Sequence, residues 1–564
     1  MKVLGAVTTL LATLLLLAGC EPSGHGPEGT DGRGTNGHVT NGQGTKGHAT
    51  NGHDAGGDEG ERGLPRNDGP RGLIRNEPGA TPGYVLFAPI LSDTTYLIDQ
   101  EGQVVHTWKG EYAPAASVYF LDNGNLLRTA REPDVEAFTG GGQGGRIREL
   151  TWESELAWDF LHSTDEYLTH HDVELLPNGN ILAIAWERKT VEEARRAGRR
   201  PDLLPEKGLW PDMVLELEPT RPEGARIVWE WHMWDHLVQN HDPEADNYGD
   251  PAARPGRIDS NGDGDEPEIS QEELEQLQAL GYVPADADVE DVRPDLLHTN
   301  AVAYNAALDQ IALSVPRFNE IWIIDHSTTS EEAAGSTGGR YGRGGDLLYR
   351  WGNPRAYGRG GKADQGLFAQ HDVRWIPDGL PGAGHLMMFS NDVPRVWPPE
   401  SKEDEDNPAN HYSAVLEIVP PLNGAGGYER LEDGPFGPAE PLWSYESYHS
   451  PFISGAQRLE NGNTLVTAGP QGRFFEVTRP GEIVWEYGTP YSGYVTNSDG
   501  SFPHPVGEAT YAVFRATKIP PDHPALAERD LKPLDPQPEI LPPPKPPEEP
   551  EAEDDEEEDK DAGA

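Results

Sequence analysis

The stretch His170-His171-Asp172-Val173-Glu174-Leu175-Leu176-Pro177-Asn178-Gly179-Asn180 decides the fold of this chain. It predicts a short strand and an Asn-Gly turn, and the apolar residues 181–185 predict the returning strand of a β-hairpin. Similar units recur at residues 120–125, 375–379 and 458–463, with a diverged copy at 303–305. A hairpin that recurs in this way is the sign of a repeat architecture.

A second recurrence consists of aromatic residues spaced by two. Side chains spaced by two lie on one face of a strand, where they can pack between neighbouring sheets. Six irregular repeats of about four strands each predict an all-β fold, a six-bladed β-propeller. The pairs are Trp158/Phe160, Trp229/Trp231, Tyr349/Trp351, Trp443/Tyr445, Trp485/Tyr487 and, more weakly, His106/Trp108.

The ring is expected to close through its two ends. Residues 84–88, 95–99 and 103–108 predict three strands, and 510–515 predicts a lone strand that completes this set as the sixth blade. Joining the first and last strands in one blade removes exposed sheet edges. The propeller is thus predicted over residues 79–520, interrupted by an acidic, partly helical insertion at 235–294.

Composition separates this core from its flanks. Only 35% of the chain is hydrophobic, with 66 Gly and 52 Pro, so long segments are expected to be loop or disordered. Residues 21–78 predict a Gly-rich flexible tether, and 521–564 a Pro-rich acidic disordered tail. The net charge of −52 argues against a nucleic-acid partner, which needs clustered Lys and Arg.

The first twenty residues predict a secretion signal. Lys2 precedes an apolar run at 3–17 that is too short for a membrane span. Leu17-Ala18-Gly19-Cys20 resembles a bacterial lipobox, so we expect lipidation of Cys20 and an exported protein anchored in the cell envelope. The alternative is an ordinary signal with a chance cysteine. Because Cys20 is the only cysteine, the fold has no disulfide.

The insertion contains Asp259-Ser-Asn-Gly-Asp263-Gly-Asp265, which begins like a calcium-binding loop. Position twelve is Ser270 in place of glutamate, which departs from that pattern. An acidic turn before a helix at 271–280 is the alternative.

Aligning the hairpins on their turns identifies the candidate site. Seven residues before each turn stand His171, His298 and His371, whereas the other two units have Ala116 and Ser454. The first strand of each propeller blade lines the central channel, so residues at its start surround one mouth. The three imidazoles are therefore expected to converge.

Strand direction places Arg317 on the same rim, because it lies in the loop after the next strand, and places the 235–294 insertion over that mouth as a candidate lid. Imidazole is a nucleophile and a general acid or base, and guanidinium binds sulfate, phosphate or carboxylate oxygens. The set suits transfer of an anionic group; the plainer interpretation is that the histidines fill the channel. We expect His170 to point away from the channel. His385, His411 and His449 have no equivalent histidine or arginine partners, and we interpret them as structural or exposed.

These motifs resemble the bacterial arylsulfotransferase family, six-bladed propellers exported to the periplasm. The resemblance covers about residues 80–520 and rests on His171-Asp with Pro-Asn-Gly-Asn, His298-Thr-Asn, Ser-x-x-Arg317, Gln-His371-Asp and the closing Tyr-Ala-Val-Phe-Arg515. It implies that His371 is a covalent nucleophile and that His171, His298 and Arg317 stabilise the sulfate. We also assign Asn300 and Ser454 to substrate binding.

The resemblance further implies transfer of a sulfuryl group from a phenolic sulfate to a phenol through sulfohistidine, with ping-pong kinetics and without a nucleotide donor, cofactor or metal. The run Gly140-Gly-Gly-Gln-Gly-Gly145 leads into a predicted strand, not the helix that a phosphate-binding loop requires. The chain departs from the family in lacking a cysteine pair that some relatives use, and in its insertion and ends. Two rivals stay open, a hydrolase with His171, His298 and His371 as zinc ligands and a non-catalytic recognition propeller.

Overall fold

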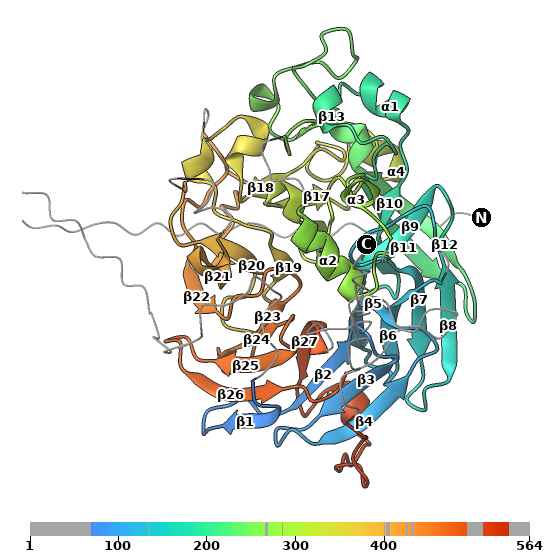
Figure 1. The fold of residues 1–564 in the computed structure, drawn as a ribbon, viewed down its shortest axis with the longest axis vertical. Helices are drawn as coiled ribbons and strands as arrows, with labels where there is room; N and C mark the ends of the chain where they lie inside the picture. Colours follow the sequence, from blue (N-terminus) through green and yellow to red (C-terminus); the bar gives the residue numbers. More distant parts are fainter. Residues whose placement is uncertain are drawn as a thin grey trace, which may run out of the picture. The chain divides into compact units, whose positions relative to one another are not determined.

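The computed structural model describes residues 69–133, 135–264, 269–284, 286–399, 401, 407–424, 427–429, 434–492 and 511–540. In this part of the chain, six antiparallel sheets of four strands or more surround a common centre (Figure 1). The predicted six-bladed propeller is confirmed. From the inner to the outer edge, blade 1 has β5 (Pro114–Phe120), β6 (Leu126–Arg131), β7 (Gly145–Leu150) and β8 (Leu156–Leu161); blade 2 has β9 (Tyr167–Leu175), β10 (Ile181–Glu187), β11 (Asp212–Pro219) and β12 (Ala225–His232); blade 3 has β15 (Ala301–Asn305), β16 (Gln310–Val315), β17 (Glu320–Asp325) and β18 (Tyr349–Trp351); and blade 4 has β19 (His371–Trp375), β20 (Leu386–Pro394), β21 (His411–Ile418) and β22 (Trp443–Ser447).

The last two blades contain the closure. Blade 5 has β23 (Gly455–Arg458), β24 (Thr464–Ala468), β25 (Arg473–Val477) and β26 (Ile483–Gly488), and blade 6 has β27 (Val513–Ile519), β2 (Tyr84–Pro89), β3 (Thr94–Ile98) and β4 (Val104–Lys109). Strand β27 pairs with β2, as the sequence predicts. Two boundaries were misplaced. β1 (Gly72–Asn76), inside the predicted tether, pairs with β26, and the Gln537 side chain, inside the predicted tail, bonds to both backbone groups of Val104. Both segments cover outer sheet edges, which would otherwise expose unpaired backbone groups.

The Asn-Gly turns and the Asp378-Gly379 turn repeat in detail. Gly124, Gly179, Gly379 and Gly462 have φ between +86° and +89°, the left-handed region that glycine adopts without steric cost. In blade 2, Asn180 donates from its side chain to Glu216 on β11 at 2.6 Å. Equivalent bonds from Asn125 to Glu149 and from Asn463 to Glu476 tie the turn to the third strand in blades 1 and 5. The second asparagine therefore stabilises the hairpin that the first one starts.

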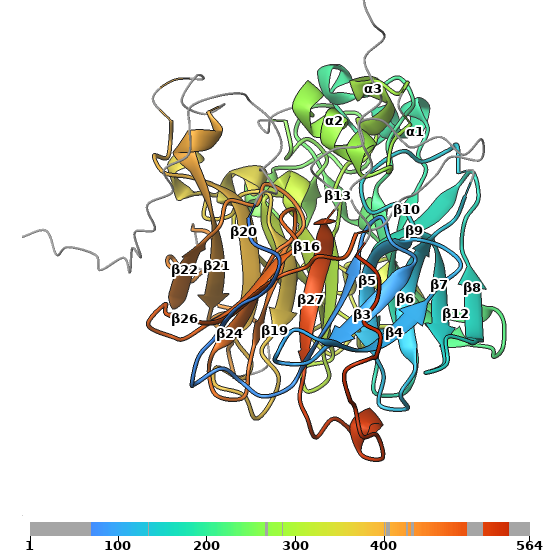
Figure 2. The same ribbon diagram turned by 60° about the horizontal axis from the view of Figure 1, so that its bottom comes forward.

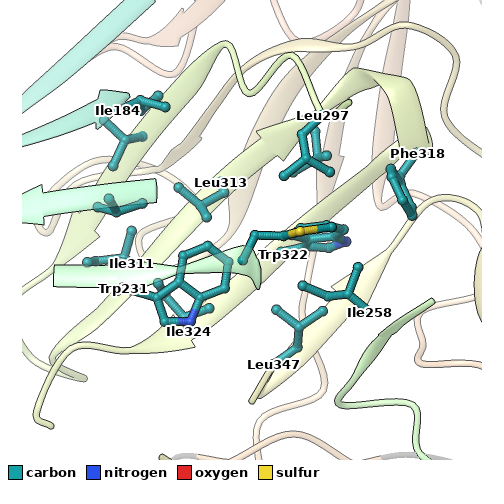
Figure 3. Close-up of a cluster of buried hydrophobic side chains, with 14 of the residues drawn as sticks. Ile184, Trp231, Ile258, Leu297, Ile311, Leu313, Phe318, Trp322, Ile324 and Leu347 are labelled. Atoms are coloured by element: carbon teal, nitrogen blue, oxygen red, sulfur yellow. The ribbon is translucent and has the colours of Figure 1, made fainter. Parts of the chain in front are cut away.

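The aromatic pairs join each blade to the next. Trp158, Trp229, Trp351, Trp443 and Trp485 lie on outer strands, and each indole N–H donates to an oxygen of the following blade or its loops. Between blades 2 and 3, Trp231 packs with Trp322, Ile184 and Leu313 in a buried apolar cluster (Figure 3). Burial at such interfaces contributes roughly 25 cal/mol per Å² of apolar surface.

Helices gather at one end of the ring (Figure 2). The helices at this end are α1 (Val191–Arg196), α2 (Gln271–Ala279) and α3 (Val289–Val292). Helix α4 (Ser330–Ala333) follows β17 and packs against β12. Reciprocal bonds between Thr190 and Glu193, and between Thr329 and Glu332, form capping boxes that start α1 and α4. The 3₁₀ turns are Pro201–Leu203, Met233–His236, Pro251–Ala253, Pro316–Phe318, Pro354–Tyr357, Lys362–Asp364, Pro408–Asn410 and Pro524–Leu526, and a short parallel pair joins β13 (Leu237–Val238) to β14 (Ile258–Asp259).

Among the residues described, no helix has both the length and the apolar character needed to cross a membrane. Cys20 and the predicted signal lie outside the described residues.

Candidate active site

A cavity of about 140 Å³ lies where the inner strands begin, and it collects the predicted residues. His171, His298, His371 and Arg317 all line it. The rings of His171 and His298 are 4.6 Å apart at their centroids and nearly perpendicular, at 80°. The ring of Phe514 from β27 lies 6.1 Å from His171 and 6.4 Å from His371. Residues from blades 2, 3, 4 and 6 therefore meet at one mouth.

The backbone at the starts of the inner strands is irregular. The pairing of β9 with β10 and of β19 with β20 shifts register beside His171 and His371. His171, His298 and Asp372 have φ of 50°, 54° and 58°, a left-handed conformation that is uncommon outside glycine. Bulges of this kind redirect side chains near active sites. This irregularity, which period-two alternation does not predict, sets how the imidazoles point.

A buried ion-pair network holds these bulges. Arg515 on β27 donates to Asp172 at 2.7 Å and lies 3.2 Å from Asp372. Asp172 also accepts the N–H of Val302, and Asp372 that of Ala456, so each aspartate of a His-Asp motif bonds to the following blade. A buried guanidinium between two carboxylates compensates their charge in a region of low dielectric. From the sequence, Arg515 is recognisable only as part of the closing strand, and its ion pairs with two aspartates from distant blades are not predicted.

His371 is held in one tautomer. Its Nδ1 lies 2.9 Å from Oδ1 of Asn391, whose amide nitrogen donates to the carbonyls of Ser450 and Ile453 at 2.7 Å each. Because those two bonds fix the amide orientation, Nδ1 carries the proton and Nε2 keeps its lone pair. The N–H of Ile453 donates to that Nε2 at 3.2 Å. Burial lowers the pKa of His371 to about 3, and the imidazole is neutral at physiological pH.

His298 has a different partner. Its Nδ1 and its backbone N–H both contact the carboxylate of Asp295, which also accepts the indole N–H of Trp186 at 3.1 Å. Burial opposes ionisation of Asp295, but the charges of His298 and Arg317 outweigh it and lower the pKa of that carboxyl. A carboxylate behind an imidazole stabilises the imidazolium, which is the arrangement of a general acid or base.

His171 is supported by another histidine. Its Nδ1 is 2.8 Å from Nδ1 of His170, whose Nε2 lies 3.3 Å from Asp212. Burial and the neighbouring His298 keep the pKa of His171 well below its usual value. His170 stacks on Trp186 and does not line the cavity, in agreement with its expected direction, but its contact with His171 was missed. His170 is a positioning residue.

The insertion covers the cavity. Ile269, Glu273, Leu277, Leu280, Tyr282 and Val292 line it. Arg317 is paired with Glu273 of α2 at 3.2 Å. On the opposite side, the Tyr282 hydroxyl donates to the Ala115 carbonyl at 2.6 Å, and Arg131 lies over the Tyr282 ring. The segment predicted as a lid thus covers the cavity and pairs with the Arg317 side chain.

The glycine run forms one wall. A Cβ on Gly142, whose φ is +72°, would lie 2.3 Å from the His171 ring, and one on Gly141 would lie 3.0 Å from His298. Only a chain without side chains can approach both imidazoles this closely. The sequence predicts no phosphate-binding loop here, because no helix follows the run, and it gives no sign of this close approach to the imidazoles.

Asn300 and Ser454 do not line the cavity, so their assignment to substrate binding is not supported by their placement. Both are fully buried. Asn300 donates to the carbonyl of Gln370 at 2.9 Å, and the Ser454 hydroxyl accepts the N–H of Gly469 at 3.0 Å. They support the inner strands from within, because their side chains turn to backbone groups and not to the mouth.

The calcium-like loop is engaged by arginine. Arg199 contacts both carboxylate oxygens of Asp263, and Asn261 donates to the Gly198 carbonyl at 3.0 Å. A guanidinium at a would-be ligand favours the acidic turn. Asp265 lies outside the described residues.

His385, His411 and His449, interpreted as structural or exposed, each have a carboxylate partner, which the sequence did not predict. Among the described residues, the set with metal-ligand spacing is Asp392, His411 and His449. His171, His298 and His371 do not form such a group there, which weighs against the zinc-hydrolase alternative.

Fold and site together define a β-propeller in which three imidazoles and a guanidinium line one cavity. A family model described as arylsulfotransferase (ASST) matches residues 87–419, more than half of the chain, and the chain belongs to this family. Membership indicates an enzyme that transfers a sulfuryl group, with aryl sulfates and phenols as its substrate classes. No curated protein matches the sequence.

Many solved structures have distant similarity to the chain, among them the following three. A protein of unknown function from Bacteroides caccae shares 10% identity over 72% of this chain and 94% of that one, with a TM-score of 0.36. The β-propeller domain of Myceliophteria thermophila Cps50 (Swd1) shares 12% identity over 79% and 98%, with a TM-score of 0.32. A streptogramin B lyase shares 12% over 78% and 90%, with a TM-score of 0.31.

Proposed function

We propose that the protein transfers a sulfuryl group from a phenolic sulfate ester to a phenolic acceptor, without a nucleotide donor, through a sulfohistidine at His371. The observation that carries this proposal is the pairing of the His371 Nδ1 with a neutral amide whose orientation is fixed. A neutral imidazole with its lone pair on Nε2 is a nucleophile.

In the first half-reaction, the Nε2 lone pair of His371 leaves its hydrogen bond with the Ile453 N–H and attacks the sulfur. An N–S bond forms as the S–O bond to the aryl group breaks. The departing phenolate takes a proton from the His298 imidazolium, which Asp295 stabilises. Sulfation leaves the His371 ring cationic, with its Nδ1 proton directed at Asn391. In the second half-reaction, His298 removes the proton of the acceptor phenol, whose oxygen attacks the sulfur and restores neutral His371.

Arg317 and the apolar wall select the donor. The guanidinium is matched to sulfate oxygens, and its present partner, Glu273, is a half-exposed carboxylate that a sulfate can replace. Leu277, Leu280, Val292, Phe452 and Phe514 give the cavity an apolar side suited to an aromatic ring. The arrangement therefore accommodates an aryl sulfate with its charge toward Arg317.

Intact-mass spectrometry after p-nitrophenyl sulfate is added without acceptor tests the proposal. We expect a gain of one SO₃, about 80 Da, that disappears when phenol is added, as a covalent intermediate requires. His371→Asn should show no gain, whereas the matched variant His385→Asn, whose histidine pairs with Glu417 outside the cavity, should be modified like the wild type. Modification of His371→Asn would exclude this nucleophile.

We also propose that the protein is exported and anchored to the cell envelope through a lipid on Cys20, on the basis of Leu17-Ala18-Gly19-Cys20. In a bacterial host, labelled palmitate should enter the wild-type protein and not Cys20→Ser. Equal labelling of both would contradict the anchor.

A further inference from the structure

A second cluster of ionisable side chains lies behind the active site, in blade 4. Oδ1 of Asp392 is 2.9 Å from Nδ1 of His411 and 2.9 Å from Nε2 of His449. One ligand atom from each residue lies within 4.8 Å of the other two. The mechanism proposed above uses none of these side chains.

The fold builds this cluster from three separate segments. Asp392 lies in a bulge near the end of β20, where the register with β21 shifts between Ser390 and Val393. His411 is the first residue of β21, and His449 follows the end of β22. Strands β20 and β22 end where β21 begins, so all three residues meet at one end of the blade. A bulge lets successive residues point to different sides.

Two imidazole nitrogens and one carboxylate oxygen form a ligand set typical of zinc. The side chains of Asp392, His411 and His449 are 37%, 12% and 29% exposed, which leaves room for water as a fourth ligand. Imidazole also favours zinc over manganese and iron in the usual affinity order.

We propose that Asp392, His411 and His449 bind a Zn²⁺ ion. The ion would take the place of the contacts that Asp392 now makes with the two imidazoles. The site is distinct from the cavity, because none of its three residues lines that cavity.

The position of the site gives it a consequence for the reaction. Asp392 directly follows Asn391, which holds Nδ1 of His371, and His449 directly precedes Ser450, whose carbonyl holds Asn391. The Ser413 hydroxyl links the same segments by accepting the N–H of Ser450 at 2.8 Å. An ion that ties Asp392 to His449 fixes the support of His371 on both sides. This consequence rests on the proposed function, whereas metal binding does not.

The test is metal content of the full-length protein after chelation, dialysis and addition of Zn²⁺, measured by mass spectrometry and by calorimetry. The wild type should bind one Zn²⁺ more than Asp392→Asn and the double variant His411→Gln/His449→Gln. His385→Gln is the matched control and should bind like the wild type, because its histidine has a single carboxylate partner. Histidines elsewhere, such as those at 38 and 53, are present in every variant and cancel in the difference.

Loss of a residue that supports a metal ligand weakens metal binding by roughly 10–100-fold. Loss of one direct ligand should weaken Zn²⁺ binding by at least as much. Equal Zn²⁺ content in wild type and Asp392→Asn overturns the site, provided that circular dichroism shows both to be folded. If the site is present, stripped wild type should sulfate His371 more slowly and recover with Zn²⁺, whereas Asp392→Asn responds to neither treatment. A rate in the wild type that ignores Zn²⁺ overturns the positioning role alone.

Discussion

His298 and His371 occupy the same position in successive blades, yet their surroundings differ. Nδ1 of His298 faces a carboxylate, Asp295, whereas Nδ1 of His371 faces a neutral amide, Asn391. A carboxylate stabilises the protonated ring, and an amide only fixes a tautomer. Equivalent positions in successive repeats bring the imidazoles together. The partner of Nδ1 then decides which imidazole is the nucleophile and which is the acid or base.

Removing the nucleophile, His371, should have the largest effect on turnover. Turnover of p-nitrophenyl sulfate with phenol should fall at least about 10³-fold in His371→Asn, since no other side chain then forms the covalent intermediate. Steady-state kinetics measure it. Near-normal turnover would mean that the two histidines have exchanged roles or that transfer is direct.

Replacing the carboxylate by an amide makes His298 resemble His371. Asp295→Asn should lower kcat by about 10²-fold, because an amide does not stabilise the imidazolium. The loss should be larger with phenyl sulfate than with p-nitrophenyl sulfate, whose leaving group needs less protonation. Equal losses with both donors would contradict proton donation by His298.

The buried, neutral state of His371 predicts a pH effect on stability. Its pKa falls from about 6.5 in the unfolded chain to about 3 in the fold. The contribution of neutral His371 to the free energy of unfolding is thus complete above pH 6.5 and is lost as the pH falls toward 3. Between pH 7 and pH 5, the free energy of unfolding of the wild type should drop by about 2 kcal/mol more than that of His371→Asn. Urea titrations at both pH values test this, and identical drops would indicate that His371 takes up its proton in the fold over the same pH range as in the unfolded chain.

Much of the fold was readable because its units repeat. The Asn-Gly turns at 178–179 and 461–462 mark where each hairpin turns, and Trp158 and Trp485 mark outer strands. These local patterns together predict a closed ring of blades. The convergence of His171, His298 and His371 follows from their equivalent positions in the repeats.

The partners of the site were not readable, because they depend on contacts between distant segments. Asn391 and Asp295 have no periodic signature, and the left-handed backbone at His171 breaks the alternation on which strand reasoning rests. Ser454 illustrates the converse. It occupies the equivalent position, but its hydroxyl turns to the backbone of the next strand.

The smallest expected effect is on KM, and it concerns the contact between the lid and Arg317. Glu273 of α2 pairs with Arg317, and both side chains are partly exposed, at 43% and 24%. Such pairs contribute only about 0–1 kcal/mol. Glu273→Gln should therefore lower KM for an aryl sulfate by at most about fivefold, with kcat little changed, because the guanidinium no longer exchanges a carboxylate for the sulfate. Initial rates over a range of donor concentrations measure it, with Glu275→Gln, on the same helix, as the control. A higher KM would mean that Glu273 positions Arg317 for the donor and does not compete with it.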